Sequence, residues 1–123
     1  MHIKGAIAHG GGPTAVLNAS LAGVCEAWGQ CPETAGLFGA RFGVEGILRE
    51  DFADLTTVRE ELLEAAARAA GSIIGSSRRA LSEEDYFAIL EVFRRREIRC
   101  FFYTGGNGSM ETALRLSRAA REL

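Results

Sequence analysis

Three glycine-rich stretches contain residue types that readily hold a phosphate group. They read HGGGPTAVLNA at residues 9–19, GSIIGSSRR at residues 71–79 and TGGNGS at residues 104–109. Glycine lacks the Cβ atom that would keep a ligand away from the backbone. Where such a turn opens a helix, the backbone N–H groups and the positive end of the helix dipole favour an anion. Each stretch is therefore a candidate phosphate-binding turn.

The first stretch matches a dinucleotide fingerprint only in part. Gly10, Gly12 and Ala15 have the G-x-G-x-x-A spacing that is expected after a strand. A site for NAD also requires an acidic residue at the end of the second strand, where this sequence has Arg41. The pattern argues against NAD, and both a phosphate turn and a turn needed only for packing stay open. His9 borders this turn, and the sequence leaves open whether it contacts a ligand or forms a structural hydrogen bond.

The second stretch adds hydroxyl donors and a cation. Gly75, Ser76 and Ser77 form the predicted turn, and Arg78 supplies a guanidinium that can grip a phosphate through two parallel hydrogen bonds. Taken alone, these residues are explained more simply by a solvated pair of arginines in a surface loop.

The third stretch combines glycines with a helix start. Gly105, Gly106 and Gly108 permit positive φ angles and close ligand approach, and Ser109 can cap the following helix. A plain turn with a capping serine would look similar. However, all three stretches follow successive extended segments, and open α/β sheets bind ligands at the carboxyl ends of their strands. Their joint occurrence predicts one phosphate site at that edge.

The segments around these turns alternate between strand-like and helix-like patterns, which is typical of an α/β domain. The predicted strands are residues 3–8, 35–40 and 99–104, with a short extended segment at 72–78. The predicted helices are residues 14–28, 57–70 and 82–93, and a last helix that begins near residue 109. We expect a three-layer, Rossmann-like domain over residues 1–123, with a mostly parallel sheet.

Three local details accompany this assignment. Ser82 and Asp85 predict a capping box at a helix start. The segment at 99–104 is apolar enough to be buried on both faces. The stretch RFGVEGIL at 41–48 is predicted to be a loop, because its glycines recur at positions 43 and 46.

The composition excludes several classes of protein. Lys and Arg number 14 against 16 Asp and Glu, a net charge of −2 that argues against nonspecific binding of nucleic acid. The three cysteines form no C-x-x-C pair, as expected of reduced thiols in a cytoplasmic protein. The N-terminus matches neither a signal peptide nor a membrane span. The last predicted helix has apolar positions that need a cover, which predicts either a homo-oligomer or the remainder of a longer chain.

Four segments, in order, resemble the N-terminal part of the 6-phosphofructokinase family: GGPTAVLNASLAGV, GARFGVEGIL, GSIIGSSR and FFYTGGNGSMETALRLS. The branch most similar in pattern is the pyrophosphate-dependent one, whose sequences carry GGPTAVINASL and GGNDSMDT-like segments. The resemblance spans nearly the whole chain. It implies phosphoryl transfer from ATP or pyrophosphate to fructose 6-phosphate in glycolysis, with Mg²⁺ as cofactor and small phosphates as ligands. It also implies that the fold is incomplete relative to the family.

The resemblance assigns roles to individual residues. Arg78 matches the arginine that bridges the donor and sugar phosphates and stabilises charge in the transition state. Phosphoryl transfer needs mainly such positioning and charge neutralisation. The positions that match the family's donor-binding residues are Gly11, Arg41, Arg78, Arg79, Gly106, Asn107, Gly108 and Ser109.

Two of these positions depart from the family's patterns. ATP-dependent members have Asp at the position of Asn107, where it helps to hold magnesium, and an amide oxygen brings no charge to that site. Pyrophosphate-dependent members usually have Asp at the position of Gly108, where its side chain obstructs the larger nucleotide. The resemblance therefore leaves ATP and pyrophosphate open as donors.

The family's catalytic base is an Asp in a TIDND segment that follows the last predicted helix and is absent from these 123 residues. General-base help of roughly 10²–10⁴-fold is then missing, so the resemblance implies a poor or inactive enzyme that keeps its donor loops. One alternative is a non-catalytic module that binds nucleotide or polyphosphate. Another is a different glycine-loop kinase, such as an NAD or lipid kinase, against which the combined match of the first and third stretches speaks.

Overall fold

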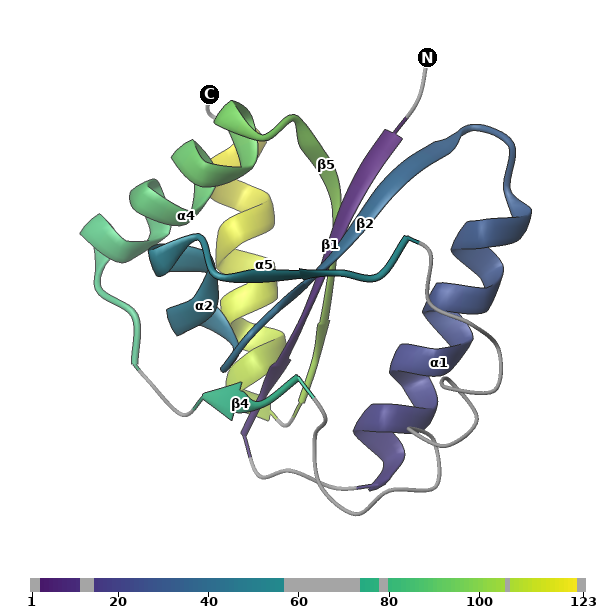
Figure 1. Cartoon of the computed structure of the whole chain (residues 1–123). Coiled ribbons are helices and arrows are strands. Elements are labelled where there is room, and N and C mark those ends of the chain that lie inside the picture. Colours follow the sequence, from purple (N-terminus) through teal and green to yellow (C-terminus); the bar gives the residue numbers. More distant parts are fainter. Residues whose placement is uncertain (1–2, 12–14, 57–73, 78–79, 106, 122–123) are drawn as a thin grey trace.

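A five-stranded sheet with helices on both faces forms the centre of the chain (Figure 1). The computed structural model describes residues 3–11, 15–56, 74–77, 80–105 and 107–121. The strands are β1 (Ile3–Gly10), β2 (Thr34–Ala40), β3 (Phe52–Asp54), β4 (Ser76–Ser77) and β5 (Ile98–Thr104). The helices are α1 (Ala15–Gln30), α2 (Val44–Arg49), α4 (Glu83–Arg95) and α5 (Asn107–Arg121). The order of elements confirms the predicted α/β class.

The sheet is built around β1, which pairs in parallel with β2, β4 and β5. β2 accompanies β1 up to Ile7, whereas β4 joins it only at His9 and Gly10. β3 adds to the other edge of β2 and is antiparallel to it. The predicted mostly parallel sheet is therefore confirmed, and β1, β4 and β5 end at the same edge.

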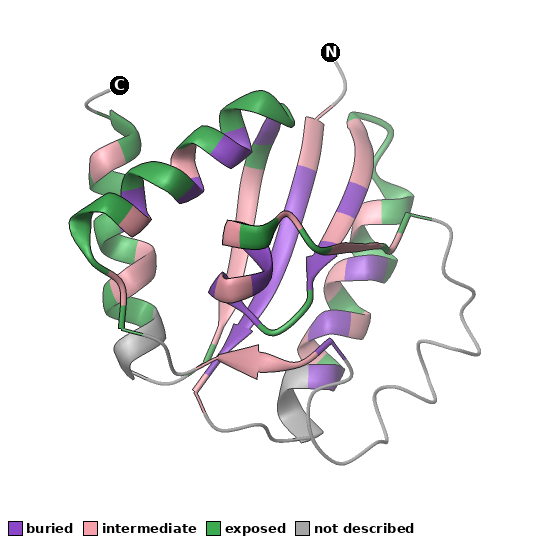
Figure 2. Ribbon diagram, turned by 60° about the vertical axis from the view of Figure 1, so that its left-hand side comes forward, coloured by how far each residue is buried: buried purple, intermediate pink, exposed green. Residues whose placement is uncertain are grey.

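Alternation along β1 divides the core into two layers. Ala6 and Ala8 belong to a cluster with residues of α2, α4 and α5, whereas Ile7 packs with Leu21 and Leu37 in a cluster with α1. Because successive side chains of a strand point to opposite faces, α1 covers one face and the other three helices cover the opposite face (Figure 1). Figure 2 shows the buried residues running along β1 between these layers. This is the expected three-layer, Rossmann-like arrangement.

The prediction of a loop over residues 41–48 is wrong, since α2 begins at Val44. Val44 and Ile47 are buried on one side of the helix, and Glu45 forms an i,i+4 ion pair with Arg49 at 3.9 Å. Gly46 is required by packing, because a Cβ atom there would collide with the carbonyl oxygen of Arg41. A glycine that read as a loop signal is therefore a point of close approach inside a helix.

Two further predictions needed correction and one held. The prediction that β5 is buried on both faces is wrong, since Cys100 to Thr104 are only partly buried. Among the described residues β5 pairs with β1 alone, so its other edge has no strand beside it. α5 begins at Asn107, so Ser109 lies inside its first turn and is not the capping residue. The capping box of α4 is confirmed, with Ser82 and Asp85 bonded reciprocally. The helix predicted over 57–70 lies outside the described residues.

Candidate functional site

The ends of β1, β4 and β5 meet at one edge of the sheet. His9 of β1 is in register with Ser76 of β4 and with Thr104 of β5. His9 and Thr104 begin the first and third glycine-rich stretches, and Ser76 lies within the second. In the sequence the first candidate phosphate turn is far from the other two, since Ser76 is 65 positions after Gly11. In the fold, all three turns leave the sheet side by side.

Two hydrogen bonds join the first and second turns directly. The backbone N–H of Gly11 donates to the carbonyl oxygen of Ser77 at 3.0 Å. The hydroxyl of Ser76 donates to the carbonyl oxygen of Gly11 at 2.7 Å. Gly11 has a φ of 71°, in the left-handed region that favours glycine. The position of Gly11 is thus fixed from the β4 side.

Two helices begin at this edge without acidic residues of their own. α1 and α5 have no Asp or Glu in their first turns. By contrast, the first turn of α4 contains Glu83, Glu84 and Asp85. Since the N-terminal end of a helix carries a partial positive charge, the starts of α1 and α5 leave that charge to other anions.

The structure describes some of the predicted site residues and not others. Gly11 lies at the shared edge, and Asn107–Ser109 form the first turn of α5, whose side chains are outside the described part. Arg78 and Arg79 directly follow Ser77 of β4, and they and Gly106 also lie outside it.

Arg41 has a binding partner that sequence reasoning did not identify. Its guanidinium donates to a carboxylate oxygen of Asp51 at 2.8 Å and to the carbonyl oxygen of Phe52 at 3.3 Å. Its own backbone N–H donates to the carbonyl of Asp51 at 3.0 Å. The side chain therefore closes the α2 turn onto β3, although its backbone follows the end of β2.

His9 is fully buried at the end of β1. Burial lowers the pKa of its imidazole from 6.5 to about 4, because a charged ring would lose its hydration. His9 is therefore a neutral group beneath the edge near neutral pH. Of the two roles left open by the sequence, the burial favours a structural one.

The turn between β2 and α2 also reaches this edge. Glycine spacing predicted only a loop there, whereas the resemblance assigned Arg41, the first residue of the turn, to the donor site. A Cβ atom at Gly43 would lie 2.5 Å from the carbonyl oxygen of His9 and 3.0 Å from the backbone nitrogen of Ser77. The neighbouring Phe42 has a φ of 61° and a side chain that is largely exposed. Residues with positive φ thus gather around the ends of β1 and β4.

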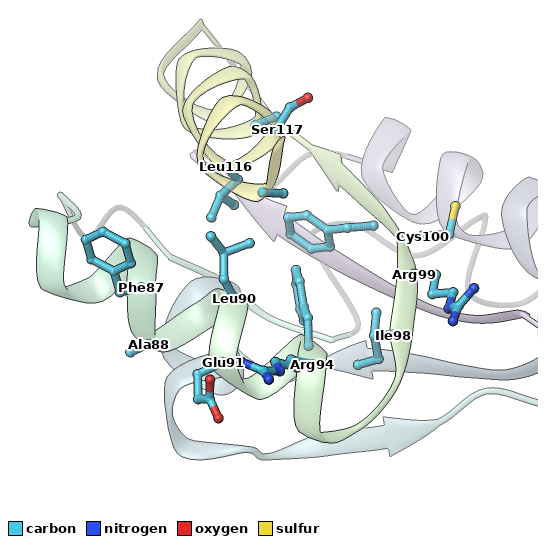
Figure 3. A pocket seen from close by; sticks show the side chains of 14 residues that line it. Phe87, Ala88, Leu90, Glu91, Arg94, Ile98, Arg99, Cys100, Leu116 and Ser117 are labelled. Atoms are coloured by element: carbon cyan, nitrogen blue, oxygen red, sulfur yellow. The ribbon is translucent and has the colours of Figure 1, made fainter. Parts of the chain in front are cut away.

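A hollow of about 1000 Å³ lies away from this edge, between α4, α5 and β5 (Figure 3). Its lining includes apolar side chains such as Leu90 and Leu116, together with the charged Glu91, Arg94 and Arg99. None of its fourteen lining residues is a glycine, and none belongs to a helix start. The glycine turns and open helix starts that suit a phosphate therefore lie at the strand ends and not in this groove.

The described residues contain neither a candidate metal centre nor a candidate membrane span. No group of three or more His, Cys, Asp or Glu side chains in the described ranges could hold a metal ion. No helix in that part of the chain is long and apolar enough to cross a membrane.

Comparison with known proteins places these features in one family. The sequence pattern of the family described as phosphofructokinase matches residues 4–123. The pyrophosphate–fructose 6-phosphate 1-phosphotransferase of Xanthomonas campestris is 39% identical over 120 residues, which cover 93% of this chain and 28% of that protein. An ATP-dependent 6-phosphofructokinase of Borreliella burgdorferi is 24% identical over 113 residues, which cover 92% of this chain and 25% of that one.

A solved structure shows the same backbone arrangement. The pyrophosphate-dependent phosphofructokinase of Nitrosospira multiformis superposes with a TM-score of 0.90 at 32% sequence identity. The superposition covers 97% of this chain and 30% of that one. The chain thus spans less than a third of the length of these relatives.

Proposed function

Because the chain belongs to the phosphofructokinase family, we propose that the edge formed by β1, β4 and β5 binds the donor phosphates of a phosphofructokinase. The enzyme would transfer a phosphoryl group from pyrophosphate or ATP to fructose 6-phosphate. The observation that carries the proposal is the register of His9 with both Ser76 and Thr104, which brings three phosphate-type turns together. Residues 1–123 would form the donor half of the site.

The proposed site uses backbone groups first and side chains second. The N–H groups around Gly11 and at the start of α5 would face the phosphates, since both helix starts lack carboxylates. Arg78, which follows Ser77, would neutralise charge on the transferred group. The further donor contacts that we propose are Arg41, Arg79, Gly106, Asn107, Gly108 and Ser109. Arg41 would have to exchange its ion pair with Asp51 for a phosphate.

Magnesium would reach this site mainly through the phosphate oxygens, since Mg²⁺ keeps several waters and takes one or two protein ligands. When bound, it would neutralise charge on the donor phosphates. Asn107 would offer an amide oxygen, either to the ion or to one of its waters. An uncharged ligand predicts weaker magnesium binding than a carboxylate at the same position.

We propose pyrophosphate as the preferred donor. The support is that the Xanthomonas relative, 39% identical, is named for pyrophosphate, whereas the ATP-dependent relative is only 24% identical. Gly108 leaves room for a nucleotide, so ATP would bind as well but less tightly. A non-catalytic module for the same phosphates is the alternative, because the TIDND segment with the family's base is not among these residues.

Calorimetric titration of the 123-residue chain with pyrophosphate and with ATP tests the half-site. We expect pyrophosphate to bind in the presence of Mg²⁺, and Arg78→Ala to raise its Kd roughly 10- to 100-fold through loss of charge-assisted hydrogen bonds. Arg118→Ala is the matched control, because Arg118 is exposed in the last turn of α5. If neither compound binds at millimolar concentration, the proposal is wrong.

An assay with fructose 6-phosphate separates the two candidate functions. For the chain alone we expect donor binding without turnover, since the TIDND segment that carries the family's base is not among these 123 residues. Turnover at a rate typical of kinases would show that the base lies within these residues. The same assay on a chain extended by a TIDND segment tests whether activity then appears.

A further inference from the structure

Phe42 occupies a backbone conformation that a bulky residue rarely adopts. Its φ is 61°, and Gly43, which follows it, has a φ of 64°. A bulky residue in the left-handed region is a genuine outlier, and such strain persists only when surrounding contacts hold it. The side chain is 56% exposed, so burial of the ring in the core is not what holds it.

Contacts with the segment before β4 hold this turn in place. The backbone N–H of Phe42 donates to the carbonyl oxygen of Ile74 at 2.8 Å. The ring lies so close to Gly75 that a Cβ atom there would come within 2.7 Å of the ring carbon Cδ1 of Phe42. Gly75 itself has a φ of 79°. The ring of Phe42 thus fits against a glycine, and neither residue can change without disturbing the other.

The same turn touches the end of β1. At Gly43 a Cβ atom would be 2.5 Å from the carbonyl oxygen of His9 and 3.0 Å from the nitrogen of Ser77. The carbonyl oxygen of Ser77 in turn accepts the hydrogen bond from Gly11. A chain of direct contacts therefore runs from the strained turn, through β4, to the first phosphate turn.

We propose that Phe42 is a positioning residue of the donor site, which holds Gly75–Ser77 against the end of β1. The inference rests on the proposed donor function and adds a residue to it that does not touch the ligand. With its ring against Gly75, Phe42 sets the position of the Ser77 carbonyl that binds Gly11. It also fixes the point from which the chain continues to Arg78. This positioning role explains both the strained backbone of Phe42 and the exposure of its ring.

Pyrophosphate titration of ring variants tests the proposal. We expect Phe42→Ala to raise the Kd about tenfold, because small displacements of positioning groups weaken binding strongly. Phe42→Tyr keeps the ring and should bind like the unchanged chain. Phe87→Ala is the matched control, since Phe87 is 58% exposed on α4, away from the turns. An unchanged Kd for Phe42→Ala would overturn the proposal.

Phe42→Asn separates the ring from the backbone, because asparagine tolerates the left-handed region and so favours the same turn. We expect it to bind pyrophosphate as weakly as Phe42→Ala. Binding equal to that of the unchanged chain would show that the ring has no role. If the unchanged chain itself fails to bind pyrophosphate, the donor function fails and not the assignment of Phe42 alone.

A double-mutant cycle with Ser76→Ala distinguishes positioning from a general loss of stability. Ser76 donates to the carbonyl oxygen of Gly11 at 2.7 Å, so both residues would act on the same turn. We expect the double variant to raise the Kd by clearly less than the product of the two single effects. A product of the two effects would mean that Phe42 and Ser76 act independently, and would contradict the proposal.

Discussion

The positive end of the helix dipole is treated differently at the start of α4 and at the starts of α1 and α5. In α4, Ser82 accepts a hydrogen bond from the N–H of Asp85 at 3.2 Å, and the Asp85 carboxylate accepts one from the N–H of Ser82 at 3.0 Å. Three carboxylates lie in that turn. α1 and α5 begin after glycines and have none in their first turns. A helix start is open to an anion only when its own side chains do not already supply one.

The two kinds of helix start also differ in what builds them. Side chains complete the start of α4, whereas close backbone contacts around Gly11 and Gly43 build the strand-end edge. Atoms added at the closely packed glycines of the edge should therefore lower stability there, and removal of the capping side chain should lower the stability of α4. The variants below test this difference, from the largest expected effect to the smallest.

Gly43→Ala should damage the edge most. The new Cβ atom would meet the carbonyl oxygen of His9, at a φ of 64° that strains any side chain. We expect the free energy of unfolding to fall by about 2–4 kcal/mol. Gly23→Ala is the control, since nothing lies within 4 Å of a Cβ at that exposed helix position. It should stabilise α1 by about 0.5–1 kcal/mol. Urea unfolding measures both, and equal effects would contradict the account.

Acid should destabilise the edge through His9. The pKa of His9 is about 4 in the folded chain, below its ordinary 6.5, so the unfolded chain binds the proton more readily. This contribution to stability is complete above pH 6.5 and falls as the pH drops toward 4, by on the order of 3 kcal/mol in full. Urea unfolding from pH 7.5 to 4.5 should therefore show a steeper loss for the unchanged chain than for His9→Gln. If the stability of both chains falls equally with pH, a group other than His9 causes the loss.

Ser109→Glu converts the start of α5 toward that of α4. A carboxylate in the first turn should leave the stability unchanged or raise it by about 0.3–1 kcal/mol. The same charge should repel pyrophosphate and raise its Kd about tenfold. Binding should therefore weaken although stability does not fall. Ser117→Glu, at an exposed position farther along α5, adds the charge away from the helix start and should leave the Kd unchanged. Weaker binding by both variants would point to net charge alone.

Ser82→Ala removes a side chain at the start of α4. Loss of the cap should lower the free energy of unfolding by about 1 kcal/mol. The Kd of pyrophosphate should stay unchanged, because this helix start is occupied by its own carboxylates. A thermal melt and one titration suffice, and a weakened Kd would remove the distinction between the two helix starts.

Local patterns predicted the fold where the stabilising contacts are local. The capping box of α4 depends on residues three apart, and the alternation of strands and helices placed β1, β2 and β5 within a few residues. α2 was missed because Gly46 faces the Arg41 carbonyl, a contact that exists only in the folded chain. The exposure of β5 depends on which strands flank it, which its own apolar sequence does not reveal.

The site was predictable in outline and not in detail. Parallel strands end at one edge, so three turns that follow strands were expected to converge there. The bond between Ser76 and Gly11 joins residues 65 positions apart, and no spacing rule indicates it. The left-handed turn at Phe42 was also hidden, because a phenylalanine gives no sign of that conformation.

The most direct test of the account is a pyrophosphate titration followed by the backbone amide NMR signals of the 123-residue chain. We expect the signals of Gly11, Gly105 and the first turn of α5 to shift together with one Kd, since these residues would line the phosphate site. The signals of residues 83–85, in the first turn of α4, should stay in place. Shifts at α4 with none at the strand-end turns would contradict the assignment of the phosphate site.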